Sequence, residues 1–330
     1  MIQTPYLIID GLNYFTRFFC VVETVSATGD LVGGVVGFIK GLGSLIDNFK
    51  PEKVIIVWEQ GGPSQRRKHI YSEYKANRAT NKTLNQMYRN DGKFITSSDG
   101  KNKVYQLQLL TKVLGHLPVC QIYVPDTEAD DIIAYLAKRK FQTVPQTKMI
   151  VSSDKDFYQL LEDDNVRIYD PGKKILIDSN YVLEKFEISC RNITLARSIV
   201  GDDSDNLDGI PGVGLKTVAH RFPDFKRNDI DLDISWLEEQ SKKLLTESKK
   251  PPKCFEDIIR HVDIVKRNWS LMYLDTSCLA STQISKIDYR LENFVPACNR
   301  LDYIKTFMAA DIPMTYDLDH TFSYAKSLIR

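Results

Sequence analysis

Four short apolar runs in the first half of the chain each lead directly to acidic side chains. The runs at 6–9, 54–58, 119–125 and 148–153 have the length and residue types of buried strands. The acidic residues that follow them are Asp10, Glu59, Glu128, Asp130, Asp131, Asp154 and Asp156. Because the carboxyl ends of parallel strands meet at one edge of an open α/β sheet, we expect these side chains to converge on one crevice.

Carboxylates gathered in one crevice repel each other, and they cannot all stay ionised in a partly dry site. Divalent cations relieve that repulsion, and carboxylate oxygens are their ordinary ligands. The pattern therefore predicts a metal site at the carboxyl edge of the sheet.

Strand and helix signals alternate to about residue 165, which predicts a mostly parallel sheet with helices on both faces. The expected strands are 6–10, 53–58, 119–124 and 148–153, followed by a hairpin of 165–169 and 173–177. The expected helices are 33–48, 104–116, 127–140 and 155–163, then 179–187, 192–200, 215–222 and more after 230. The simplest division is an α/β domain over 1–185 and a helical domain over 186–330.

Charge is distributed unevenly along the chain. The net charge of +1 says little about partners, but residues 64–103 contain ten basic and three acidic side chains, a local balance of +7. A basic segment beside an acidic crevice suits an anionic polymer held near metal ions.

The remaining composition narrows the class of protein. The six cysteines are scattered without a CxxC pair, so neither a zinc site nor a disulfide framework is indicated, and reduced thiols in a cytoplasmic protein are expected. The first strand starts too early for a signal peptide, and the apolar stretch 31–46 is interrupted by glycines and a lysine. No membrane role is expected, and the protein is expected to be a monomer.

Each acidic group also has an ordinary explanation. Asp10 precedes a glycine and is typical of a turn, and the acids near 128 and 154 suit the positive end of a helix. Capping accounts for Asp130 but leaves Glu128 and Asp131, three residues apart on one helix face, without a role. In extended backbone, two acids at i and i+2 such as those after 153 point the same way and can share one ion.

A second acidic group and a glycine-rich turn follow the α/β region. Asp202 and Asp205 lie three apart, so one helical turn would present both to the same side, although a solvated acidic loop is the alternative. The turn after them contains Gly209, Ile210, Gly212, Val213, Gly214, Lys216 and Thr217. Glycines allow close approach of a phosphate, and a helix N-terminus offers free N–H groups.

The basic segment interleaves cations with aromatic rings. Its candidate nucleic-acid contacts are Arg66, Arg67, Lys68, Tyr71, Tyr74, Lys75 and Arg78. Charged runs are often solvated helix faces, but Lys75 and Arg78 are expected at i and i+3 of a helix, with two tyrosines interleaved. Such cations can hold a phosphate while an aromatic ring stacks on a base.

Taken together, the runs IIDG, YSEYKANR, EADDIIAYLA, SSDKDFYQLL and GDDSDNLDGIPGVGLKT resemble the flap endonuclease / 5′→3′ exonuclease family. That family includes the 5′-nuclease domain of bacterial DNA polymerase I and free-standing bacteriophage 5′-nucleases, some called phage ribonuclease H. The similarity covers about residues 5–225 with the motifs in order, and the chain is most similar to the free-standing phage type. One departure is glutamate in Trp58-Glu59-Gln60-Gly61, where the family usually has aspartate in an FDG-like run.

The resemblance implies a PIN-like α/β nuclease core, a helical arch over about 63–103 and a helix-three-turn-helix DNA-binding element near 201–222. It assigns Asp10, Glu59, Glu128 and Asp130 to a first metal ion, and Asp131, Asp154, Asp156, Asp202 and Asp205 to a second. It makes Lys75 and Arg78 the cations that contact the scissile phosphate, and it makes the turn Ile210–Gly214 a potassium site on duplex DNA. The implied cofactors are two Mg²⁺ ions, with Mn²⁺ as a substitute.

The implied activity is two-metal hydrolysis of phosphodiester bonds at 5′ flaps and at nicked or gapped duplexes, including RNA primers in RNA–DNA hybrids. Two alternatives remain open at this point: a PIN-type single-strand ribonuclease, and a non-catalytic protein that binds branched DNA. The residues after about 230 either complete the helical domain or dock a replication partner such as a single-strand-binding protein or a sliding clamp.

Overall fold

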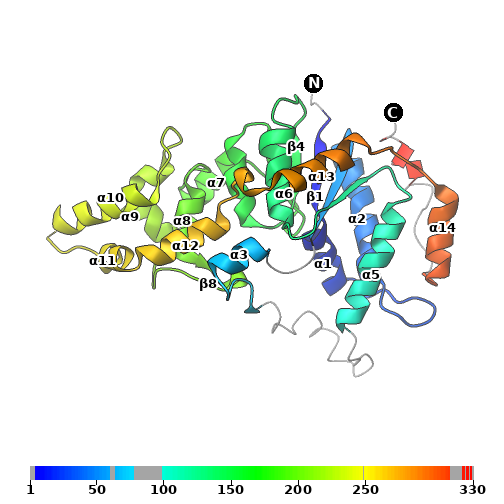
Figure 1. Ribbon diagram of the computed structural model, residues 1–330, viewed down its shortest axis with the longest axis horizontal. Coiled ribbons are helices and arrows are strands. Elements are labelled where there is room, and N and C mark those ends of the chain that lie inside the picture. The colour runs from blue at the N-terminus through cyan, green and yellow to red at the C-terminus, as the bar shows by residue number, and fades with distance from the viewer. Residues whose placement is uncertain are drawn as a thin grey trace.

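The computed structural model describes residues 4–59, 64–77, 99–247 and 249–312, together with 322, 323, 325, 326 and 328. The molecule is elongated, with a sheet and its covering helices toward one end and a group of helices at the other (Figure 1). The α/β architecture predicted from the alternation of strands and helices is confirmed, and a smaller helical part follows it.

The central sheet has the strand order β3-β2-β1-β4-β5-β6 among the described residues. Its strands are β1 (Tyr6–Asp10), β2 (Lys53–Trp58), β3 (Cys120–Tyr123), β4 (Lys148–Val151), β5 (Val166–Asp170) and β6 (Ile175–Ile177). All neighbours pair in parallel except β5 and β6, which form the expected antiparallel hairpin. Strand order reverses at β1 and β4, and the carboxyl ends of these two strands form the crevice where α/β sheets bind ligands.

The strands are apolar on both faces because helices cover both sides of the sheet. In register, Leu7 pairs with Val54 and Met149, and these three side chains belong to one core. The next residues along, Ile8 and its partner Ile55, belong to the core on the opposite face. The two-residue period of the strands therefore separates the cores, and a slip of one residue would exchange them.

Helices pack on each face of the sheet. One core contains residues of α1 (Gly11–Val21), α2 (Gly33–Phe49) and α5 (Asp99–Leu114). The other contains residues of α6 (Ala129–Tyr135), the π-helical turn Leu136–Lys140, the 3₁₀-helix Lys155–Glu162 and α7 (Ser179–Phe186). Helix α1 was not predicted from the sequence, where only a turn was expected after Asp10.

The expected basic arch is described only at its two ends. Helix α3 (Gln65–Ile70) begins it, a turn occupies 71–76, and α5 ends it. Residues 78–98 lie outside the described part of the chain, and Arg78 is among them. The expectation that Lys75 lies on a helix is wrong, since its φ of 58° places it in the left-handed region.

The helical part is built around α8 (Ile193–Val200) and α12 (Val262–Met272), which pack against each other. Helices α9 (Leu215–Arg221), α10 (Ile234–Glu247) and α11 (Lys253–Arg260) extend it away from the sheet (Figure 1). Between α8 and α9, the short strands β7 (Gly201–Asp202) and β8 (Leu207–Asp208) pair around the 3₁₀ turn Asp203–Asp205. Gly201 has φ of 81°, and a Cβ there would lie 2.4 Å from the Leu207 carbonyl oxygen, so the loop requires glycine at this position.

The end of the chain returns to the α/β core. Helix α13 (Ser281–Glu292) packs on β3, and α14 (Arg300–Ala309) packs on α5. Tyr303 and Phe307 of α14 are fully buried, at 0% exposure, in the core that α2 and α5 share. The division into an α/β domain over 1–185 and a helical domain over 186–330 stays a prediction, and these two helices of the second part pack against the α/β core.

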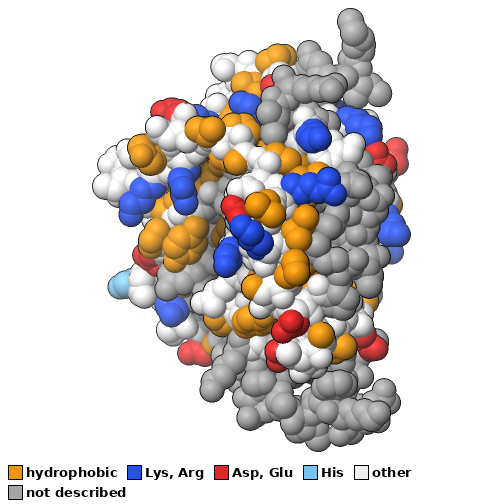
Figure 2. Space-filling model, turned by 90° about the vertical axis from the view of Figure 1, so that its right-hand side faces the viewer, with side chains coloured by type: hydrophobic (Ala, Val, Ile, Leu, Met, Phe, Trp, Pro, Cys, Tyr) orange, Lys and Arg blue, Asp and Glu red, His pale blue; other side chains and the backbone are white. Residues whose placement is uncertain are grey.

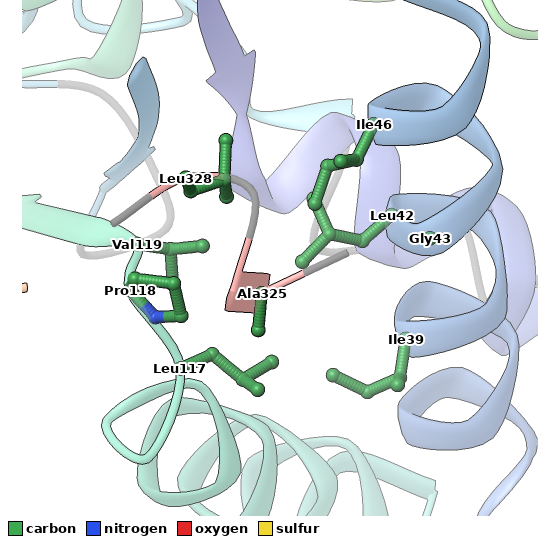
Figure 3. A pocket seen from close by; sticks show the side chains of 9 residues that line it. All are labelled: Ile39, Leu42, Gly43, Ile46, Leu117, Pro118, Val119, Ala325 and Leu328. Atoms are coloured by element: carbon green, nitrogen blue, oxygen red, sulfur yellow. The ribbon is translucent and has the colours of Figure 1, made fainter. Parts of the chain in front are cut away.

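A small apolar pocket marks the seam where the C-terminal residues meet this core. Figure 3 shows Ala325 and Leu328 facing side chains of α2 and the segment before β3. The lining residues are Ile39, Leu42, Gly43, Ile46, Leu117, Pro118, Val119, Ala325 and Leu328. Since every lining residue is apolar, the seam is packed core that holds the end of the chain. On the same end of the molecule, apolar side chains lie among lysines and arginines (Figure 2).

Among the described residues, none of the helices has the length and apolar character needed to cross a bilayer.

The buried face of α14 gives a direct test of this packing. Phe307→Ala is expected to lower the free energy of unfolding by about 3–5 kcal/mol, because it leaves a cavity in a fully buried site. The neighbouring Met308 is 65% exposed, so Met308→Ala is expected to change stability by no more than about 0.5 kcal/mol. Urea unfolding of both variants is the measurement, and equal stabilities would contradict the packing described here.

Candidate active site

Asp10 and Asp154 mark the crevice at which strand order reverses. Asp10 is the last residue of β1 and caps α1, since one of its carboxylate oxygens accepts the Asn13 N–H at 3.1 Å. The Ser152 hydroxyl, just beyond β4, donates to the other Asp10 oxygen at 3.2 Å and accepts the Asp154 N–H at 3.1 Å. Ser152 therefore links the two acids, a role that sequence reasoning did not assign to it.

The environment of Asp10 disfavours its charged form. Burial, followed by repulsion from Glu59, raises the pKa of Asp10 from 3.8 to about 8, and Asp130 and Asp154 add to the effect. Burial also raises the pKa of Asp154, with Asp130 as the next cause. Carboxyl groups with raised pKa values, such as these two, can exchange their protons for a metal ion.

Three further acids come together beside Asp10. Carboxylate oxygens of Glu59, Glu128 and Asp130 all lie within 4.8 Å of one another, close enough to share one ion. Glu59 follows β2 and accepts the Ala129 N–H at 3.3 Å, at the start of α6. The extra methylene of glutamate therefore does not prevent this side chain from joining the cluster.

These acids have opposite protonation tendencies. Burial and then repulsion from Asp130 raise the pKa of Glu59 to about 7. Burial also acts to raise the pKa of Glu128, but attraction to Arg67 and Lys75 outweighs it and lowers that pKa to about 2. Direct pairing with these cations therefore keeps Glu128 ionised, whereas Glu59, with a pKa of about 7, is only partly ionised at neutral pH.

Arg67 was expected to contact DNA, but the structure shows it buried at 1% exposure. Its guanidinium pairs with both oxygens of Asp131, at 3.0 and 3.1 Å, and with Glu128 at 3.0 Å. Its Nε donates to the Leu271 carbonyl in α12 at 3.2 Å. A buried guanidinium requires such partners, and none of its donors points to solvent.

Asp131 was expected to bind the second metal ion. Both of its oxygens are instead paired with Arg67, and Arg66 approaches to 3.7 Å. In this conformation its charge is used to hold cations of α3.

Lys75 enters the acid cluster from the turn after α3. It is 7% exposed, and its Nζ lies 2.6 Å from Glu128 Oε2. Burial opposes its positive charge, but Asp130, Tyr74 and Glu128 raise the pKa of Lys75 well above its usual range. The ammonium group thus stays charged next to the candidate ligands.

A second group of acids lies across the crevice around Arg197. This arginine of α8 donates to Asp156 at 2.8 Å and to Asp202 at 2.9 Å. Burial, only partly offset by Arg197, raises the pKa of Asp156 to about 7, with Asp154 and Asp130 contributing. Sequence reasoning missed Arg197, although an arginine within the apolar helix ITLARSIV requires a buried partner.

Asp156 and Asp202 differ in geometry from what was expected. Asp154 has extended backbone and caps a 3₁₀-helix by accepting the Asp156 N–H at 2.8 Å, whereas Asp156 lies inside that helix, so the two acids do not share one extended segment. Asp202 caps the next 3₁₀ turn and is held by Ser204 and Arg197. Asp205, at the end of that turn, contributes to the raised pKa of Asp156 and so lies within electrostatic reach of it.

The remaining expected contacts lie in several environments. Tyr74 was expected to stack on a base, but it is buried at 3% exposure and hydrogen-bonds Asp205. Lys68 is exposed, Arg66 is half-buried, and Tyr71 is half-buried with the Arg267 guanidinium 4.2 Å from its ring centre.

The glycine-rich turn after β8 presents its backbone outward. The side chains of Ile210 and Val213 are buried, which anchors the turn in the core. Gly212 has φ of 72°, and a Cβ at Gly212 or Gly214 would meet nothing within 4 Å. Gly212 and Gly214 therefore form an open backbone surface before α9, with Lys216 exposed and Thr217 half-buried beside it, whereas Gly209 packs against the Val200 main chain, where a Cβ would clash.

The parallel sheet with buried acids at its point of reversal defines a PIN-like nuclease core. A family model described as the 5′-3′ exonuclease N-terminal resolvase-like domain matches residues 5–187. The chain is 29% identical to a 5′-3′ exonuclease of Buchnera aphidicola subsp. Schizaphis graminum over 226 residues, covering 68% of this chain and 71% of the relative. It is 30% identical to a 5′-3′ exonuclease of Aquifex aeolicus over 214 residues, covering 64% and 67%.

Three further comparisons extend the similarity beyond the matched domain. DNA polymerase I of Thermus aquaticus is 29% identical over 283 residues, which cover 85% of this chain and 30% of the polymerase. A bacteriophage T5 flap endonuclease in a complex with DNA and metal ions has a TM-score of 0.67 at 18% identity, covering 92% of this chain and 98% of that chain. The catalytic core of Rad2 in complex with DNA substrate has a TM-score of 0.52 at 12% identity, covering 100% and 93%.

The chain therefore belongs to the 5′-3′ exonuclease family. It is a 5′-nuclease, an enzyme of the same class as these relatives. The expected nuclease fold and enzyme class are confirmed.

Stability of the metal-free protein is expected to fall as pH rises from about 5 to about 9. Asp10, Glu59 and Asp156 have folded-state pKa values of about 8, 7 and 7, above their unfolded values, so their contribution is complete below about pH 4 and is lost as pH passes those values. Glu128 has the opposite shift, and its contribution is lost only as pH falls toward about 2.

Thermal unfolding in EDTA, and then with Mn²⁺, across this pH range measures the effect. Mn²⁺ should raise the melting temperature more at about pH 8 than at about pH 6, because fewer protons then compete for the carboxylates. A melting temperature in EDTA that rises steadily through this range would contradict the crowding described above.

The buried guanidinium of Arg67 is expected to be essential to stability. Arg67→Met should lower the free energy of unfolding by about 3–5 kcal/mol, since it leaves Glu128 and Asp131 buried with one fewer counter-charge. The adjacent Lys68 is exposed, so Lys68→Met is a matched control expected to change stability by about 0.5 kcal/mol or less. If both variants unfold at the same denaturant concentration, Arg67 does not have this role.

Proposed function

We propose that this enzyme cleaves phosphodiester bonds at the junction of a 5′ single strand and duplex DNA, using two divalent ions bound in the acidic crevice. The observation that carries the proposal is the meeting of Glu59, Glu128 and Asp130 within 4.8 Å beside the buried Asp10. These four acids are assigned to the first ion. Asp154, Asp156 and Asp205 are assigned to the second, across the crevice.

The donor set suits Mg²⁺ or Mn²⁺. All proposed ligands are carboxylates, which are hard oxygen donors, and no histidine or cysteine belongs to the cluster within the described part of the chain. Burial and then repulsion from neighbouring carboxylates raise the pKa values of Asp10, Glu59 and Asp156, and bound cations would relieve that repulsion. Asp131 and Asp202 were expected to bind the second ion. We propose instead that their carboxylates pair with Arg67 and Arg197.

When bound, the two ions supply an activated water and charge stabilisation for an in-line displacement. Glu128 and Asp130 orient the first ion from the start of α6, and Asp154 orients the second from the end of β4. The Lys75 ammonium lies at the edge of this group and is paired with Glu128. It can form an ion pair with the phosphate instead as negative charge develops there. We assign Arg78 the same task on sequence grounds, since it lies outside the described residues.

The substrate class follows from surfaces around the crevice. The open backbone at Gly212 and Gly214 suits close approach to a duplex phosphate, with Lys216 exposed beside it, and K⁺ coordination by this turn belongs to the same proposal. Arg66 and Lys68 add positive charge at the base of the arch. The substrates would be 5′ flaps, nicked or gapped duplexes, and RNA primers in RNA–DNA hybrids.

Partner proteins and location remain predictions. A single-strand-binding protein or sliding clamp would have to use surfaces other than the buried side of α14, which packs on α5. We also propose that the protein acts as a monomer in the cytoplasm. The family match favours this function over a single-strand ribonuclease or a non-catalytic binding protein, and preferential cleavage of unstructured RNA would reverse that choice.

Asp154→Asn tests the proposal most directly. Loss of one carboxylate charge at the second ion is expected to lower the cleavage rate of a 5′-labelled flap by at least about 10³-fold. Binding of the same flap, measured in Ca²⁺ by fluorescence anisotropy, is expected to change by less than about threefold, because the phosphate contacts are elsewhere. Asp164→Asn makes the same chemical change at an exposed acid and is the matched control. Full cleavage by Asp154→Asn would refute the assignment.

A further inference from the structure

A small apolar cluster, separate from the two cores of the sheet, joins the base of the arch to the helical part. It consists of Tyr74, Leu207, Leu271 and Met272, with Tyr71 packed at its edge. Its members come from the turn after α3, from β8 and from the end of α12. We refer to this cluster as the joint.

Hydrogen bonds fix the joint in both directions. The Lys75 N–H donates to the Asp205 carbonyl at 2.9 Å, and the Asn77 side chain donates to the Asp203 carbonyl at 2.8 Å. In return, the Asn206 side chain donates to the Glu73 carbonyl at 2.8 Å. The turn 71–77 and the loop 203–206 therefore hold each other.

Two non-glycine residues in left-handed conformations face each other across this contact. Lys75 has φ of 58° and Asn206 has φ of 59°. Such conformations persist in a bulky residue only where the surroundings determine them. The contact between turn and loop is therefore a specified feature of the fold.

The joint ends on a candidate metal ligand. The Tyr74 hydroxyl donates to Asp205 Oδ2 at 3.1 Å, while the ring is 3% exposed and locked by Leu207, Leu271 and Met272. Asp205 is 9% exposed, and its main-chain carbonyl is held by the same turn through Lys75. One tyrosine and its neighbour thus fix Asp205 at both its backbone and its carboxylate.

We propose that Tyr74 is a positioning residue for the second metal ion: its hydroxyl sets the orientation of the Asp205 carboxylate. Hydrogen bonds to a ligand from outside the coordination sphere fix its rotamer and tune its affinity for metal. This inference rests on the proposed function, which assigns Asp205 to that ion. Because Tyr74 lies in the turn after α3, that turn and the metal ligand form one packed unit.

Tyr74→Phe removes only the hydroxyl, and Tyr71→Phe is the matched control from the same turn. In calorimetric titration with Mn²⁺ in the absence of DNA, the wild type should bind two ions. Tyr74→Phe should weaken the weaker site by about tenfold and leave the tighter one unchanged. Tyr71→Phe should leave both affinities unchanged, since the structure gives its hydroxyl no link to Asp205.

Leu207→Ala distinguishes a purely structural role of Tyr74 from a positioning role. It loosens the packing of the same cluster and leaves the hydrogen bond between Tyr74 and Asp205 in place. If Leu207→Ala weakens Mn²⁺ binding as much as Tyr74→Phe does, the joint acts through packing alone and the positioning role is refuted. In an Asp205→Asn background, Tyr74→Phe should have no further effect on the Mn²⁺ titration. A separate tenfold loss there would also refute the proposal.

Cleavage provides a second readout. At saturating flap substrate, Tyr74→Phe should raise the Mg²⁺ concentration for half-maximal rate by about tenfold, with KM for DNA unchanged. If the wild type binds two Mn²⁺ ions and Tyr74→Phe matches it, this inference fails and the proposed function stands. If the wild type binds no Mn²⁺, the proposed function itself fails.

Discussion

Repulsion among buried carboxylates at the point where strand order reverses is the constraint on which the rest of the structure depends. Asp10 cannot leave this position, because it ends β1 and caps α1 with the same side chain. Acids from β2, α6 and β4 are brought to it by the register of the sheet. Burial and then repulsion from the neighbouring acids raise the pKa of Asp10 to about 8, and both follow from its place in the strand order; a metal ion would relieve the repulsion.

Three buried cations make this acidic region compatible with a folded protein. Arg67 and Lys75 approach from the basic segment, and Arg197 approaches from α8 in the helical part. Each is paired with acids of the α/β core, so the site is assembled from both parts of the chain. Part of the positive charge that the sequence suggests for DNA binding is therefore paired inside the protein. The exposed lysines and the backbone of the glycine-rich turn remain accessible to a substrate.

Much of this arrangement could be predicted from sequence because it depends on local pattern. Apolar runs with acids at their ends specify parallel strands and a convergent site, and the acids near Glu128 and Asp154 lie there. Orientation within the basic segment could not be predicted, because helical spacing for Lys75 assumed a backbone that its left-handed φ contradicts. The burial of Arg67 and Tyr74 depends on α12, about two hundred residues later, which no local pattern reveals. The packing of α14 against the α/β core was not predicted for the same reason, since an amphipathic pattern shows that a helix has a buried face but not what that face packs against.

The joint formed by Tyr74, Leu207, Leu271 and Met272 affects how this protein can be divided. A cut between the sheet and the helical part would expose those side chains to water and separate Arg67 from the Leu271 carbonyl. The α/β part and the helical part are therefore not independent units, and neither is expected to be replaceable without the other. We therefore expect the two parts to unfold together, so that a substitution in one part affects the stability of the other.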